Sequence, residues 1–184
     1  MTDPLPPLAE PSDLAYLPGA PFSEEEVTAA CAAVRTAARW HIAPVVTETV
    51  SLDVVPHDRW LRLPTGKLIQ VTTIHDADTD ELVASTTYRV SRNLAQVKRS
   101  EPWPCGYERV EVTMVHGYES TPVDLFPVIA QAITLGRRDP TVQATSIDDY
   151  SVTYAKVGPS TSALVGLLGS YALDDAALYG LGLA

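Results

Sequence analysis

Hydrophobic and polar residues alternate most regularly between residues 110 and 135, where the pattern predicts a strand, a turn and a helix. Val110, Val112 and Met114 recur at the two-residue period of a half-buried strand. Gly117 then supplies the permissive backbone that a reversal of the chain requires. The following helix carries one apolar stripe at helical spacing, formed by Leu125, Val128, Ile129, Ala132 and Ile133. We expect this helix to form a wall of the core, since burial of each large side chain contributes roughly 1.5–3 kcal/mol.

Two residues compete to cap the start of this helix. Thr121 with Asp124 three positions later forms a capping-box pattern, with Pro122 at the first helical position. That register would place Pro127 deep enough in the helix to remove a backbone hydrogen bond. If Asp124 is the N-cap instead, Pro127 falls in the first turn, where its missing N–H costs nothing. We therefore favour Asp124 as the cap, and Gly136 predicts the end of the helix.

A second helix is predicted near the start of the chain, after an arm rich in proline. Residues 1–22 contain six prolines and therefore read as an extended arm, which allows at most one short helical turn at 13–17. Ser23 and Glu26 then form a capping box. The apolar face of this helix consists of Val27, Ala30, Cys31, Val34 and Ala38. Pro44 is expected to end the helix.

Between the two helices, the hydrophobic period changes to that of β-strands. Short strand-like runs occupy residues 60–63, 68–74, 81–84, 87–90, 94–97 and 109–115, and turn-forming residues separate them. A further run of this kind lies at 149–154. The predicted fold class is α+β, with two main helices packed with an antiparallel β meander, an extended N-terminal arm and a C-terminal tail.

The end of the sequence is too apolar for a free coil and too rich in glycine for a stable isolated helix. Four large residues there can share one helical face and are candidates for docking on a partner: Leu164, Leu167, Leu168 and Tyr171. The alternative is that this tail folds back and completes the core of its own domain. We predict three parts of the chain, which are an arm at 1–22, a core domain at 23–158 and a tail at 159–184.

Composition limits the class of protein. A chain of 184 residues with 46% apolar residues is long enough for one real core and is not a disordered chain. We expect no signal peptide, because the sequence does not begin with a basic n-region and an apolar h-region. We expect no membrane span, because no apolar run free of charge and glycine reaches about 18 residues. The net charge of −10 is concentrated at the two ends, and residues 1–26 hold six acids and no base. This distribution argues against tight, sequence-blind binding of nucleic acid.

Motifs for catalysis or metal binding are weak. The four histidines show no metal-ligand spacing, so we expect no metal site and no cofactor. Residues 76–80 resemble the start of a calcium loop, but Glu81 and Thr87 stand where that loop needs Gly and a bidentate Glu, which favours a solvated turn. A nucleophile pair of Cys105 and His116 has no local support. Four basic residues cluster on neighbouring predicted strands: Arg89, Arg92, Lys98 and Arg99. They form either a solvated face of the sheet or a contact surface for an acidic neighbouring subunit or DNA.

The order of these elements over residues 13–155 resembles the head-tail connector proteins of long-tailed bacteriophages, also called adaptor or head-completion proteins. The resemblance rests on Asp13-Leu14, the capped helix at 23–41, Leu61-Arg-Leu-Pro64, Val71-Thr-Thr-Ile74, Tyr88-Arg-Val90, Trp103, Val110-Glu-Val-Thr113, Gly117-Tyr118, Pro122-Val-Asp124 and the strand at 149–154. No single motif is specific, and their order carries the resemblance. The arm and the tail depart from the family pattern, being longer and more apolar respectively.

The resemblance implies a structural virion protein that is not an enzyme. Such a protein sits in the neck of the virion as a ring, commonly of twelve copies, under the portal vertex. Its partners would be the portal protein, neighbouring copies of itself and a tail-side neck or tail-completion protein, and packaged DNA would pass through the lumen without specific binding. No membrane is involved, and assembly would occur in the host cytoplasm. The rival interpretation is a small hydrolase or ligand-binding domain with a pocket under Trp103.

Overall fold

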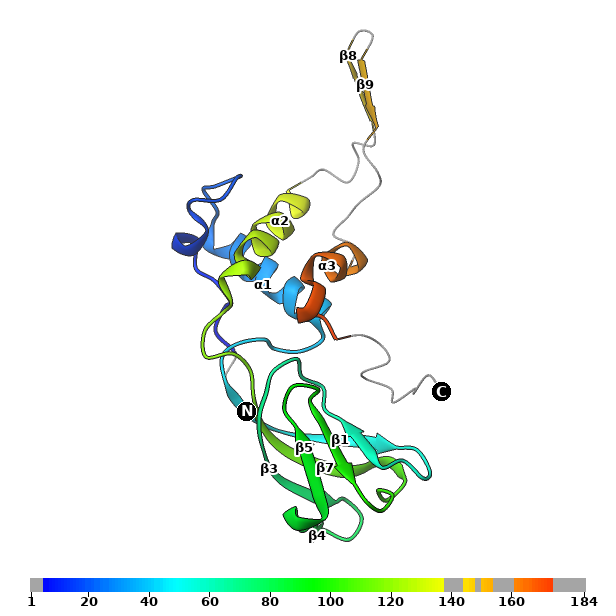
Figure 1. Ribbon diagram of the computed structural model, residues 1–184. Helices are drawn as coiled ribbons and strands as arrows, with labels where there is room; N and C mark the ends of the chain where they lie inside the picture. Colours follow the sequence, from blue (N-terminus) through cyan, green and yellow to red (C-terminus); the bar gives the residue numbers. More distant parts are fainter. Residues whose placement is uncertain (1–4, 138–143, 148–149, 154–160, 174–184) are drawn as a thin grey trace. The chain divides into compact units, whose positions relative to one another are not determined.

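The computed structural model describes residues 5–137, 144–147, 150–153 and 161–173, and it has the predicted α+β fold (Figure 1). Contacts divide the chain into two compact units. One unit, here called the helical unit, combines residues 1–38 with 121–169. The other, called the sheet unit, combines residues 39–120 with 170–184. None of the helices in the described ranges is long and apolar enough to cross a membrane. The boundaries predicted at residues 22 and 158 stay a prediction.

The helical unit is built from three helices that pack on one another. These are α1 (Glu24–Ala38), α2 (Phe126–Gly136) and α3 (Thr161–Leu168). Strands β8 (Ala144–Ile147) and β9 (Tyr150–Thr153) form a separate antiparallel hairpin, and only β9 was predicted.

Helix α1 begins as the sequence predicts. The Ser23 N–H donates to Glu26 Oε2 at 2.9 Å and the Glu26 N–H donates to Ser23 Oγ at 3.2 Å, which confirms the capping box. All five residues of the predicted apolar face are buried. Cys31 is one of them, and burial raises the pKa of its thiol, as expected for a core cysteine. The end of the helix was predicted wrongly, because α1 stops at Ala38, where Arg39 takes a φ of 65°, well before Pro44.

Helix α2 begins one residue later than predicted. A 3-10 turn at Val123–Leu125 runs directly into the α-helix, so Asp124 lies inside this turn and is not the N-cap. Leu125 already has right-handed helical dihedrals, and the chain enters α2 with no side-chain cap. Pro127 lies in the first turn of α2 and Gly136 ends the helix, as predicted. The predicted stripe is buried except for Val128, which is half-buried.

The described part of the predicted arm packs within the helical unit. A 3-10 turn at Pro11–Leu14 follows a capping box between Glu10 and Asp13. Three arm residues besides Phe22 are buried: Leu8, Ala9 and Leu14. The Arg35 guanidinium of α1 donates to the Pro6 carbonyl at 2.7 Å. Residues 5–22 therefore contribute to the core of this unit, although prolines keep most of them outside regular elements.

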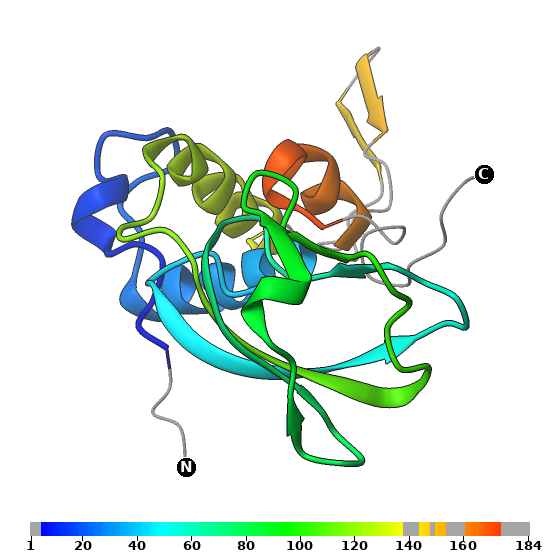
Figure 2. The same cartoon turned by 60° about the horizontal axis from the view of Figure 1, so that its bottom comes forward.

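Two antiparallel sheets form the sheet unit, and Figure 2 shows their strands curving around one interior. The larger sheet has the order β1 (Val46–Val54), β7 (Gly106–His116), β3 (Leu68–Asp76) and β4 (Glu81–Leu82). The smaller sheet has the order β2 (Trp60–Arg62), β6 (Gln96–Arg99) and β5 (Tyr88–Ser91). Antiparallel pairing is confirmed, but neighbouring strands are mostly not consecutive, so the arrangement is not a simple meander.

Strand β7 occupies the centre of the larger sheet and explains this order. Its alternate residues Val110, Val112, Met114 and His116 are all buried, and it pairs with β1 on one side and β3 on the other. Strand β1 was not predicted, although Val50, Leu52 and Val54 alternate with polar residues at the two-residue period of a strand. The main core cluster joins residues of both sheets and includes Leu61, Ile74, Val97 and Trp103 together with the buried face of β7.

Candidate functional site

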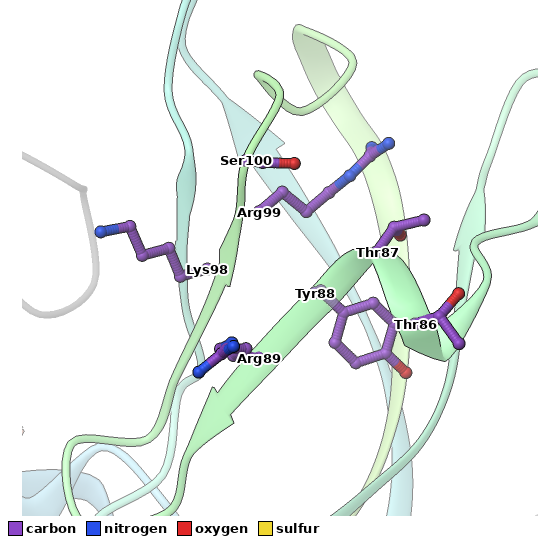
Figure 3. A pocket seen from close by; sticks show the side chains of 7 residues that line it. All are labelled: Thr86, Thr87, Tyr88, Arg89, Lys98, Arg99 and Ser100. Carbon is purple, nitrogen blue, oxygen red and sulfur yellow. The ribbon is translucent and has the colours of Figure 1, made fainter.

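Three bases gather where β5 and β6 pair. Arg89 lies directly opposite Lys98, and Tyr88 lies opposite Arg99. With neighbouring hydroxyl-bearing residues they line a hollow of about 370 Å³, formed by Thr86, Thr87, Tyr88, Arg89, Lys98, Arg99 and Ser100 (Figure 3). Arg92, the fourth predicted base, is exposed and is not among the residues that line it. The structure thus brings together three of the four bases.

These side chains do not converge on one point. Figure 3 shows Arg89 and Lys98 on one side of the strands and Arg99 with Tyr88 on the other, as strand alternation requires. Like charges directly opposite each other destabilise a strand pair. Cation–π contacts offset part of this cost, since the Lys98 Nζ lies 4.4 Å from the Trp60 ring centroid and the Arg99 guanidinium 4.8 Å from that of Trp103. The result is a basic surface suited to an acidic partner, and not a cup for one small anion.

A second cluster lies at the end of β7. It comprises His41 from the segment between α1 and β1, Glu48 from β1, and His116, the last residue of β7. One potential ligand atom from each residue lies within 4.8 Å of the others. His116 Nε2 is 3.0 Å from Glu48 Oε2, and the His41 and His116 rings meet edge-on with centroids 4.5 Å apart. His41 Nε2 donates to the Pro44 carbonyl at 2.7 Å.

Burial governs the chemistry of His116. The His116 side chain is 1% exposed, while Glu48 is 52% exposed. Burial, followed by the nearby His41, lowers the pKa of His116, and the Glu48 carboxylate only partly opposes this shift. His116 therefore favours its neutral form, which keeps a lone pair on one ring nitrogen. Its Nδ1 is buried and has no hydrogen-bond partner among the described residues.

Gly117 permits the close packing around this cluster. Its φ of 110° favours glycine, and an added Cβ would lie 2.6 Å from His41 Nε2. The Gly117 N–H donates to the Lys67 carbonyl at 2.9 Å, so the turn after β7 is held in place.

The sequence-based expectation of no metal-ligand grouping considered only local spacing. Glu48 and His116 are 68 positions apart in the chain, and the pairing of β1 with β7 brings them together. One signal was present in the sequence: His116 continues the buried alternation of Val112 and Met114, which places an imidazole at a core-facing position.

Two other candidates do not form sites of the kinds considered from the sequence. Exposed Cys105 precedes β7 and His116 ends it, so this 11-residue strand separates them by roughly 35 Å, and they are no nucleophile pair. At residues 76–80 the chain forms the expected turn, in which Asp76 Oδ1 accepts the Asp78 N–H at 3.1 Å. Arg109 is 2.9 Å from Asp76 Oδ2 and also pairs with Asp78, so a guanidinium balances these acids.

The four predicted docking residues of the tail are separated by the structure. Leu164 and Leu168 are buried, and their helix α3 packs on α1 in the helical unit. Leu167 is 39% exposed. Tyr171 lies beyond the end of α3, so the four residues do not share one helical face. Its carbonyl accepts the Trp40 indole N–H at 2.7 Å in the sheet unit. Docking on a partner stays a prediction.

Comparison with known proteins finds similarity only among solved structures. No model of a known family matches the sequence, and no curated protein matches it. A chain from the neck of an empty gene transfer agent (GTA) particle, computed with C6 symmetry, is 17% identical with a TM-score of 0.49, over 92% of this chain and 95% of that chain. A chain from the neck of a native GTA particle, computed with C12 symmetry, is 18% identical with a TM-score of 0.49 over the same shares. A chain from the virion of a native GTA particle is 19% identical with a TM-score of 0.47, over 84% of each chain. Structural similarity at these identities and TM-scores does not by itself assign a function.

Proposed function

We propose that this chain is a head-tail connector: a structural, non-enzymatic protein in the neck of a long-tailed phage or phage-like particle. The observation that carries the proposal is the order of connector-like motifs over residues 13–155, together with where they fall in the fold. Leu61-Arg-Leu-Pro64 spans and leaves β2, Val71–Ile74 lies in β3, and Val110–Thr113 lies in the central strand β7. Trp103 is buried in the same core cluster as residues of these strands, so the motif residues build the fold itself.

The ring and its partners are part of this proposal. We infer about twelve copies, seated under the portal protein and receiving a tail-side neck protein, with packaged DNA passing through the lumen without specific binding. Charge complementarity supports contact between copies. The β5–β6 surface exposes Arg89 and Lys98, while α1 exposes Glu24 and Glu25 at its start. Such contacts are individually weak, and ring closure on a preformed portal multiplies them.

The tail offers a contact for the portal. Val165 and Leu167 are 38% and 39% exposed on α3, and an apolar pair of this kind gains free energy when a partner covers it. Leu164 and Leu168 hold α3 on its own unit, so they do not take part directly. We propose that Leu167 is the portal-facing member of the four residues that the sequence selects.

The rival interpretation as a hydrolase or ligand-binding domain places its pocket under Trp103. Trp103 is 2% exposed, and its indole N–H donates to the Arg59 carbonyl at 3.2 Å. Its backbone N–H donates to the Asp58 carbonyl at 2.8 Å. A tryptophan satisfied and covered in this way supports the core and offers no surface to a ligand.

Sedimentation of the purified chain, alone and mixed with the portal protein of the same particle, tests the proposal. We expect a small species alone and a ring-sized complex with the portal. The double variant Arg89→Glu with Lys98→Glu should lose the complex, because it removes the basic surface. Arg92→Glu is the matched control, since Arg92 is an exposed base outside the hollow. Failure of the unaltered chain to join the portal would contradict the proposal.

A further inference from the structure

We propose that His41, Glu48 and His116 form a binding site for one divalent transition-metal ion of the Zn²⁺ type. The three residues come from three separate segments of the sheet unit, and their ligand atoms lie within 4.8 Å of one another. Ligand atoms around a tetrahedral Zn²⁺ lie about 3.4 Å apart, given metal–ligand distances of roughly 2.1 Å. The 3.0 Å between His116 Nε2 and Glu48 Oε2 is close to this spacing, and the exposed Glu48 side chain is free to adjust.

The hydrogen bond of His41 matches that of a metal-ligating histidine. Such a histidine usually donates its second ring N–H to a carboxylate or a backbone carbonyl, which fixes the tautomer and the ring orientation. His41 Nε2 makes this bond to the Pro44 carbonyl at 2.7 Å. In that tautomer the lone pair of the neutral His41 ring lies on Nδ1.

His116 supplies the buried half of the site. Its side chain is 1% exposed, and its Nδ1 has no hydrogen-bond partner among the described residues. A metal ion on Nε2, which lies 3.0 Å from Glu48 Oε2, would place the proton of the neutral ring on this Nδ1. Metal binding requires this ring in its neutral form.

The donor set selects the class of ion. Two imidazoles and one carboxylate suit Zn²⁺, Co²⁺ or Ni²⁺, whereas Ca²⁺ and Mg²⁺ need mainly oxygen ligands. Three protein ligands leave a fourth position for water or for a group from a neighbouring copy. The ion would join the segment before β1 to strands β1 and β7, and so stabilise the sheet unit. This role is independent of the connector proposal.

Titration of the metal-stripped full chain with Co²⁺ tests the site, because bound Co²⁺ gives visible absorption that reports its ligands. We expect one equivalent to bind, Zn²⁺ to displace it, and saturating Zn²⁺ to raise the melting temperature by about 4 °C or more. Glu48→Gln and His41→Gln should each weaken Co²⁺ binding by at least about tenfold. Removing a residue that only hydrogen-bonds to a metal ligand already lowers metal affinity by roughly 10- to 100-fold, and these variants alter the ligands themselves.

His57→Gln is the matched control, because His57 is an exposed histidine outside the cluster. It should bind Co²⁺ as the unaltered chain does. Circular dichroism of each metal-free variant shows that the fold is retained, and the half-exposed Glu48 makes Glu48→Gln the safest variant. No binding by the unaltered chain would overturn the proposal and leave Glu48 and His116 as a hydrogen-bonded pair. Unchanged binding by Glu48→Gln, or loss of binding in His57→Gln, would overturn it as well.

Discussion

Arg137 and Glu26 form a two-point ion pair between the end of α2 and the start of α1. Arg137 Nε lies 2.6 Å from Glu26 Oε1, and Arg137 Nη2 lies 2.7 Å from Glu26 Oε2. The same guanidinium donates to the carbonyls of Gly19 and Pro21 at 2.8 and 2.9 Å. One side chain therefore fastens two helices and the chain that precedes α1. A bidentate, networked pair of this kind is more effective than a simple surface ion pair.

Glu26 should make stability depend on pH. Chiefly through its hydrogen bond with Arg137, the pKa of Glu26 is lowered from 4.5 to about 2. Because this pKa is lower in the folded state, its contribution to stability is present above pH 4.5 and is lost as pH falls toward 2. Glu26→Gln should therefore lower the melting temperature at pH 7 and have little effect near pH 2. Thermal melts of the unaltered chain and the variant between pH 2 and pH 7 test this pH dependence, with Glu25→Gln as the control. If Glu26→Gln lowers the melting temperature equally at both pH values, the prediction is wrong.

Helix α2 should be a stability element and not a contact surface. Ile129 is fully buried, so Ile129→Asp would place an unpaired charge in the core. The expected cost is several kcal/mol, which is comparable with the roughly 5–15 kcal/mol that stabilise a typical domain. Circular dichroism should show an unfolded or insoluble variant. Gln131→Asp, at an exposed position of the same helix, is the control and should fold. A folded, soluble Ile129→Asp protein would show that the stripe does not face the core.

Two glycines should respond in opposite ways to alanine. Gly117→Ala combines a φ of 110° with a Cβ 2.6 Å from His41 Nε2, so it should cost about 1–3 kcal/mol or more. Gly136→Ala adds a Cβ that meets no atom within 4 Å, at the end of α2, and should be neutral or slightly stabilising. Urea unfolding of both variants checks the pair. Equal stability of the two variants would contradict the packing described around Gly117.

Buried and exposed leucines of α3 should have different roles, in stability and in portal binding respectively. Leu168→Ala should lower the free energy of unfolding by roughly 2–5 kcal/mol, because Leu168 is 2% exposed against the helical unit. Leu167→Ser should leave the melting temperature almost unchanged and weaken binding to the portal. Thermal melts and portal binding of the two variants separate these roles. Portal binding that survives Leu167→Ser undiminished would show that Leu167 is not the docking residue.

Local signals in the sequence were enough for much of the fold. The capping box of Ser23 and Glu26, the buried face of α1 and the alternation in β7 were all predicted correctly, because each depends on residues within one element. Starts and ends of helices were less accurate. Helix α1 ends because Arg39 takes a positive φ, and an arginine gives no sequence signal for that conformation.

Long-range pairing explains what the sequence did not predict. Strand β1 has alternating apolar residues at Val50, Leu52 and Val54, but its place beside β7 is set by pairing between residues far apart in the chain. The same pairing carries Glu48 to His116, so the cluster at the end of β7 could not be predicted from the spacing of the histidines. The basic surface was predicted because Arg89 and Lys98 lie on strands that are adjacent both in sequence and in space.

Quantitative mass spectrometry of purified particles, compared with the remaining lysate of the producing cells, tests the connector proposal most directly. We predict that the chain is enriched in the particles at a copy number equal to that of the portal protein, about twelve per particle if the ring is closed. Its absence from the particles and retention in the lysate would contradict the proposal and return the chain to the class of host-cell enzymes or binding proteins.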